Sequence, residues 1–151
     1  MAPKISHTTV ISAPIDQVWK ALVDIDDWKW NKWTRLEASE AKTGATGKLK
    51  ACYAGNGQDW KTFDFVFGEV SQENHLLTWK GKVGGGVLFS GHHTMELEEI
   101  DNQTTRLIHK ERFGGLLPML NLGLPYKTLD RNYLLMNEAL KVHVEGTAHA
   151  Q

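Results

Sequence analysis

The chain has 151 residues, of which 41% are hydrophobic and 23% are charged, and its formal net charge is -1. This composition is ordinary for a folded globular protein and argues against a disordered chain. The small net charge gives no general attraction to nucleic acid or to an anionic membrane.

Length and targeting signals predict a single domain in a reducing compartment. A chain of this length is typical of one domain, and we expect its core to cover residues 4–146. The single Cys52 leaves no internal disulfide, which fits the cytoplasm. The first residues lack the apolar region of a secretory signal, and no apolar run approaches the roughly 20 residues of a membrane helix. We therefore expect a cytoplasmic protein that is not embedded in a membrane.

The first elements are predicted to be a strand and a short helix. Residues Lys4–Ser12 alternate between β-branched and polar side chains, as in a strand. Pro14 suits the first turn of a helix, and Asp16 complements the helix dipole there. One face of this helix carries apolar residues at helical spacing, namely Val18, Trp19, Leu22 and Ile25. The helix is expected to end near Asp24–Asp27.

The segment Trp28–Trp33 holds three tryptophans and has two interpretations. It is either a second short helix or the lead into a strand. Its rings either close one end of the core or line the entrance to a pocket.

The middle of the chain is predicted to be an antiparallel meander. Period-two patterns separated by glycine and asparagine turns define six further strands: Thr34–Lys42, Lys48–Ala54, Thr62–Val70, His75–Val83, Val87–Ile100 and Thr104–Phe113. Short strands joined by tight turns favour antiparallel neighbours.

The end of the chain is predicted to be one long amphipathic helix. After Gly114 and Gly115, the apolar segment Leu116–Leu120 resembles a helical turn or a lid. From Tyr126 to Glu145 the apolar residues fall at three- and four-residue spacings, which gives a helix of about five turns. Its apolar face carries Leu129, Tyr133, Met136, Leu140 and His143 or Val144. Gly146 is expected to end the helix.

This element order resembles the START-like or helix-grip superfamily, within its polyketide cyclase/dehydrase and lipid-transport (SRPBCC-type) group. The residues that carry the resemblance are Ser12–Trp19 with Leu22 and Asp24, then Leu77–Trp79, Leu97, and Thr105–His109 continuing into Glu111–Gly115. The resemblance implies an α+β fold, in which a seven-stranded antiparallel sheet wraps around the C-terminal helix and two short helices follow the first strand. It also implies an apolar cavity that holds a hydrophobic small molecule.

Strand phase selects three polar residues that face this cavity. In the last strand His109 and Glu111 share the parity of Leu107 and Phe113, so we expect them to point inward. His93 shares the parity of Met95 on the preceding strand and could lie near His109. This cluster either orients a ligand or acts as an acid/base pair, with His109 and Glu111 as catalytic candidates, or it is a structural polar network.

The cavity walls are expected to be aromatic and aliphatic. The candidate ligand-binding residues are His93, Trp79, Phe65, Phe89, Tyr53, Met95, Leu120, Tyr133 and Met136. The same rings could instead fill a closed core, and Tyr126 and Tyr133 could offer hydroxyls either to a ligand or to the protein. No metal or nucleotide motif is found, and no cofactor is expected. Adjacent His92 and His93 would point to opposite faces of a strand.

Three functions are compatible with these patterns. The first is binding of a hydrophobic or aromatic small molecule, lipid- or polyketide-like, in the cavity. The second is a polyketide cyclase or dehydratase, a lyase or isomerase that uses His109 and Glu111 for proton transfer. The third is a non-catalytic protein-interaction module, which predicts an exposed apolar patch on the outer sheet face or around Trp28–Trp33.

Overall fold

The structure, a computed structural model, describes residues 4–116 and 125–149. Its seven strands are β1 (Lys4–Ile11), β2 (Thr34–Glu37), β3 (Thr46–Ala51), β4 (Lys61–Ser71), β5 (Leu76–Val83), β6 (Phe89–Asp101) and β7 (Thr104–Gly114). The helical elements are α1 (Ile15–Val23), the single turns η1 (Ile25–Asp27) and η2 (Gly84–Gly86), and α3 (Tyr126–His149).

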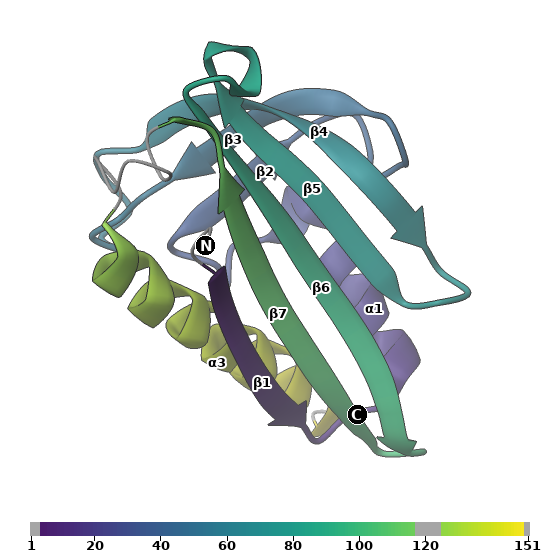
Figure 1. The fold of residues 1–151 in the computed structure, drawn as a ribbon. Coiled ribbons are helices and arrows are strands. Elements are labelled where there is room, and N and C mark those ends of the chain that lie inside the picture. Colours follow the sequence, from purple (N-terminus) through teal and green to yellow (C-terminus); the bar gives the residue numbers. More distant parts are fainter. Residues whose placement is uncertain (1–3, 117–124, 150–151) are drawn as a thin grey trace.

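All seven strands form one antiparallel sheet in the order β1-β7-β6-β5-β4-β3-β2. Strands β2 to β7 are a meander, and β1 joins it beside the last strand. The sheet curls around α3, and α1 lies on the same side (Figure 1). The predicted α+β helix-grip fold is therefore confirmed. Among the described residues, no helix is long and apolar enough to cross a membrane.

The segment after α1 differs in detail from the predicted second helix. Only the single 3-10 turn η1 follows α1, and Trp28–Trp33 runs through turns into β2. The indole N–H of Trp28 donates to the carbonyl of Leu22 at 3.0 Å, so this ring is fixed against the end of α1. Trp28 is 3% exposed and closes one end of the core, whereas Trp33 is half-buried.

Gly146 does not end α3, contrary to the prediction from sequence. The helix continues to His149, and Gly146 does not adopt the positive φ of a C′ residue. The hydroxyl of Thr147 donates to the carbonyl of His143 at 3.0 Å, four residues earlier. Because that carbonyl is also the helical acceptor for the Thr147 backbone N–H, the hydroxyl bond is an addition to the helical pattern and does not by itself explain the extension.

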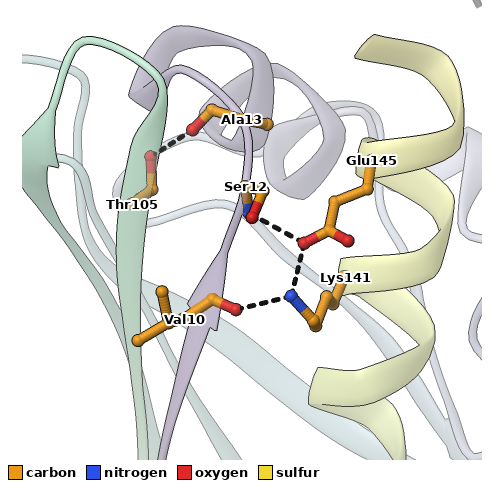
Figure 2. A network of polar contacts seen from close by, with 6 residues as sticks. All are labelled: Val10, Ser12, Ala13, Thr105, Lys141 and Glu145. Carbon is orange, nitrogen blue, oxygen red and sulfur yellow. Dashed lines mark hydrogen bonds and ion pairs between the residues drawn. The ribbon is translucent and has the colours of Figure 1, made fainter. Parts of the chain in front are cut away.

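The C-terminal half of α3 is anchored to the end of β1. Lys141 donates to the carbonyl of Val10 at 2.9 Å and also contacts the carboxylate of Glu145. The same carboxylate accepts the backbone N–H of Ser12 at 2.7 Å (Figure 2). These polar contacts hold the last turns of the helix against the strand.

The two halves of α3 belong to different hydrophobic clusters. Met136, Leu140 and Val144 pack into the main core with α1 and the middle of the sheet. The first half contributes Leu129 and Tyr133 to a smaller cluster with Ile5 and Phe113. The pocket described below is lined by residues of both clusters.

Candidate functional site

A pair of glycines leaves space on the inner face of the sheet. Gly81 of β5 and Gly91 of β6 are partners across these neighbouring strands. Neither residue carries a side chain, so the sheet surface is locally hollow between Phe65 on one flank and Phe113 on the other. The hollow faces the first half of α3.

The next row of the sheet places a carboxylate and an imidazole beside this hollow. His93 is the register partner of both Trp79 and Glu111. All three side chains point inward because they alternate with exposed or half-buried residues along their strands. The His93 ring stacks on the Trp79 indole, with centroids 4.5 Å apart and planes 10° apart, so its orientation is fixed from one side.

Five side chains form one continuous buried hydrogen-bond network. His93 Nε2 lies 2.7 Å from Glu111 Oε2, and His93 Nδ1 lies 3.2 Å from His109 Nε2. His109 Nδ1 lies 2.9 Å from Asn137 Oδ1. The hydroxyl of Tyr133 donates to Glu111 Oε1. The network thus joins β6 and β7 to α3, and all five residues are buried.

The geometry of this network assigns its protons. Asn137 Oδ1 is an acceptor, so His109 Nδ1 carries a proton and donates it. Burial and the neighbouring His93 lower the pKa of His109 to about 3, so its Nε2 is an unprotonated acceptor for His93 Nδ1–H. One further proton then lies between His93 Nε2 and Glu111 Oε2. Imidazolium with carboxylate, or imidazole with carboxylic acid, satisfies the same contacts.

Tyr133 acts in this network as a donor only. Burial, the charge of Glu111 and the hydrogen bond to it raise the pKa of the Tyr133 hydroxyl well above its ordinary value. Deprotonation would place two negative groups in contact in a dry environment. Burial and Glu111 also raise the pKa values of Tyr53 and Tyr126.

The sheet–helix pocket, as we name it, lies between the glycine hollow and the first half of α3. Its lining is Trp33, Thr34, Leu49, Ala51, Tyr53, Phe63, Gly81, Phe89, Gly91, His93, Glu111, Leu129, Asn132 and Tyr133. The cavity volume is about 60 Å³, which is enough for a few waters and less than the about 150 Å³ of a cavity that takes up benzene. An organic ligand would therefore have to widen it.

The sequence-predicted site residues separate into three groups. Those in the pocket lining are Tyr53, Phe89, His93, Glu111 and Tyr133. Those in the main core are Phe65, Trp79, Met95 and Met136, each at most 1% exposed. His109 lies behind His93, away from the lining, and Leu120 lies outside the described residues.

There is a physical reason why some predicted site residues lie in the core instead of the pocket lining. Strand parity predicts which side chains face inward, but it does not predict where along the strand the sheet–helix space remains open. Trp79 is covered by His93 and Trp28, and Phe65 packs edge-on against Phe67 at 5.0 Å. These rings fill the space rather than border it.

The sequence analysis missed several residues of the site, among them Asn132, Asn137, Gly81 and Gly91. Asn132 and Asn137 lie on the buried face of α3, where polar residues break the apolar pattern; that interruption was the available signal. Gly91 lies within a strand, and a Cβ at this position would be 2.6 Å from Glu111 Oε2. A glycine inside a strand pattern is a known sign of close approach.

The described residues show neither a cluster of metal-ligating side chains nor an exposed apolar patch at the tryptophans. Within residues 4–116 and 125–149, no group of three or more His, Cys, Asp or Glu side chains could hold a metal ion. His92 is exposed on the outer face of β6, opposite His93. The tryptophans of the Trp28–Trp33 segment pack in or against the core.

Comparisons with known proteins agree on one family and one fold. The family model described as polyketide cyclase / dehydrase and lipid transport matches residues 2–145. No curated protein matches the chain. Solved structures do match at low sequence identity, which shows the fold alone.

Three of these solved structures illustrate the similarity in fold. The Zhui aromatase/cyclase from a Streptomyces species has a TM-score of 0.76 at 17% identity, covering 96% of this chain and 94% of that chain. A Thermus thermophilus protein has a TM-score of 0.71 at 17% identity, covering 97% and 99%. Norcoclaurine synthase from Thalictrum flavum, solved with dopamine and hydroxybenzaldehyde, has a TM-score of 0.67 at 13% identity, covering 95% and 87%.

Proposed function

The chain belongs to the polyketide cyclase/dehydrase and lipid transport family, and on this premise we propose that it binds a hydrophobic or aromatic small molecule in the sheet–helix pocket. The observation that carries the proposal is a largely apolar lining with a few buried polar groups, among them the Glu111–His93–Tyr133 contact. Ligand pockets are mostly apolar, with a few polar groups that fix orientation.

Ligand entry requires movement, and the structure favours the first half of α3 as the part that moves. The second half is held by Lys141 and Glu145 at the end of β1 and by the main core. The first half packs through the smaller cluster of Leu129, Tyr133 and their neighbours, and it also forms the hydrogen bonds of Tyr133 to Glu111 and of Asn132 to Tyr53. Lifting this half breaks these two bonds but leaves the main core in place, and the low-stability parts of a protein are those that open.

Binding of the methyl ether of β-naphthol, measured by titration calorimetry, tests the proposal. We expect saturable binding with one site per chain. Gly81→Leu places a side chain in the pocket and should weaken binding at least tenfold. Gly146→Leu adds the same side chain where nothing lies within 4 Å of its Cβ, and should leave binding unchanged. Failure of both this ether and β-naphthol to bind, or equal binding of the ether by the two variants, would contradict the proposal.

A second candidate function is acid/base catalysis on a bound ligand, supported by the 2.7 Å contact of His93 and Glu111 in the pocket lining. In a dehydration the pair would remove a proton from the carbon beside a carbonyl. The new C=C bond would form as the β-hydroxyl leaves, and that proton would return to it to give water. His109 would position His93, since it does not border the pocket.

Glu111→Gln separates the two candidates. With an aromatic β-hydroxy ketone as substrate, the enzyme function requires that this variant lose turnover while the naphthol methyl ether still binds. Turnover equal to that of the wild type would exclude Glu111 as the base. The absence of any turnover by the wild type would leave the binding function as the better account.

A further inference from the structure

Asn132 is the polar residue of the pocket whose hydrogen-bonding capacity is left half used. It lies on the first half of α3 and is 2% exposed. Its Nδ2 donates to the carbonyl of Tyr53 at 3.0 Å. Its Oδ1 is buried and has no hydrogen-bond partner among the residues that the structure describes.

The orientation of this amide is settled by its partner. A backbone carbonyl only accepts hydrogen bonds, so the atom of Asn132 that faces Tyr53 must be the nitrogen. The free atom is therefore the oxygen, an acceptor. Leaving a buried acceptor without a donor is unfavourable, and a ligand donor could remove that cost.

Three other buried polar side chains of the lining, those of Glu111, His93 and Tyr133, already have partners. Glu111 accepts from Tyr133 through Oε1 and contacts His93 through Oε2, and the second ring nitrogen of His93 faces His109. Among the described residues of the lining, Asn132 Oδ1 is thus the fully buried polar side-chain atom that still lacks a hydrogen-bond partner.

We propose that Asn132 selects ligands that carry a hydroxyl donor on an aromatic or otherwise apolar body, the hydroxyl donating to Oδ1. This inference rests on the proposed binding function and specifies its ligand class. A site built to hydrogen-bond a hydroxyl discriminates strongly against an analogue that lacks it, because the buried partner is then left unpaired. The bond to Tyr53 fixes the amide before the ligand arrives, so little ordering is required on binding.

The test compares β-naphthol with its methyl ether, which keeps the oxygen and the ring system but lacks the O–H. In the wild type, β-naphthol should bind at least about tenfold more tightly than the ether. Asn132→Leu should reduce this ratio to about one, mainly by weakening the naphthol. Thr34→Val removes a hydroxyl elsewhere in the lining; it affects both probes alike, so the ratio should persist.

The possible outcomes distinguish the role of Asn132 from the proposed binding function. Equal binding of the two probes by the wild type overturns the role of Asn132 and leaves the proposed binding function standing. A tenfold preference that survives in Asn132→Leu also overturns it, since another group would then accept the hydroxyl. If neither probe binds to the wild type, the proposed binding function fails and this inference fails with it. The wild-type comparison holds even where the Asn132 variant does not fold.

Discussion

Glu111 Oε2 and His93 Nε2 lie 2.7 Å apart, on residues that face each other across β7 and β6. Glu111 is the one acidic side chain in the buried set of the described residues. A buried carboxylate is costly unless it is paired and hydrogen-bonded. The contact with His93 and the hydrogen bond from Tyr133 meet that requirement, and they hold the carboxylate at the edge of the pocket.

Two substitutions at Glu111 should differ strongly in stability. Glu111→Gln can still accept from Tyr133 and can donate to His93 Nε2, so we expect a loss of about 1 kcal/mol in the free energy of unfolding. Glu111→Leu leaves both partners unpaired and should lose about 3–5 kcal/mol. Urea denaturation of the two variants measures the difference. Losses of equal size would show that the hydrogen bonds at Glu111 contribute little.

Acidification should destabilise the protein through His109. Its pKa falls from 6.5 in the unfolded chain to about 3 in the folded protein, chiefly because of burial. The unfolded chain therefore binds a proton first, and the stability contributed by His109 is fully present above pH ~6.5 and is lost progressively down to pH ~3. At about 1.4 kcal/mol per unit, the contribution is on the order of 3–5 kcal/mol.

Chemical denaturation across this pH range tests the effect, with NMR of the His109 ring as a second readout. Its ring signals should not titrate above pH ~5. His109→Gln should show a weaker dependence of stability on pH than the wild type, whereas the half-buried His143, which is outside the network, provides the control His143→Gln. A normal titration of His109 near pH 6.5 would refute its assignment as a neutral acceptor.

Replacing each of the two paired glycines with alanine should affect stability unequally. Gly91→Ala would bring a Cβ to 2.6 Å from Glu111 Oε2, which displaces the carboxylate and should cost about 1–3 kcal/mol. Gly81→Ala meets only Leu49, at an ordinary contact distance of 3.6 Å, and should change stability by less than about 1 kcal/mol. Thermal unfolding of both variants provides the comparison, and a reversed order would mean that Glu111 does not occupy this position.

Amide hydrogen exchange should differ between the two halves of α3. Residues 129–135 belong to the smaller cluster, whereas residues 139–145 are held by the main core and by the anchor at Lys141 and Glu145. We expect faster exchange in the first segment, and we expect β-naphthol to slow exchange there selectively. Uniform exchange along the helix, unaffected by the probe, would argue against opening at this end.

Much of the fold follows from local patterns in the sequence. Period-two alternation with glycine and asparagine turns predicted the meander, and helical spacing predicted the face of α3 that carries Leu129, Tyr133, Met136 and Leu140. Strand phase alone placed His93, His109 and Glu111 on the inner face, and the structure brings them together. Strand ends were less accurate: β2 ends at Glu37 rather than Lys42.

The finer structure of the site depends on long-range register and could not be predicted. The pairing of Gly81 with Gly91 opens the pocket; a glycine within a strand signals close approach, but the sequence does not show that these two glycines are neighbours. Asn137 and Asn132 meet residues 28 and 79 positions away, and no local pattern encodes such contacts. Whether a ring such as Trp79 borders a cavity or fills the core is likewise decided by packing across the whole sheet.

The location of a bound aromatic probe is the most direct test of the central claim. One competing site is the groove of about 330 Å³ between α1 and α3, lined by Gln17, Lys20, Ala21, Asp24, Asp27, His143, Val144 and Thr147. NMR titration of the wild type with β-naphthol distinguishes the two, because ring currents shift the nearest amide and methyl signals. Our account predicts the largest shifts at Gly81, Gly91 and Leu129. Largest shifts at Gln17, Lys20 and Thr147, or no saturable shifts at all, would contradict it.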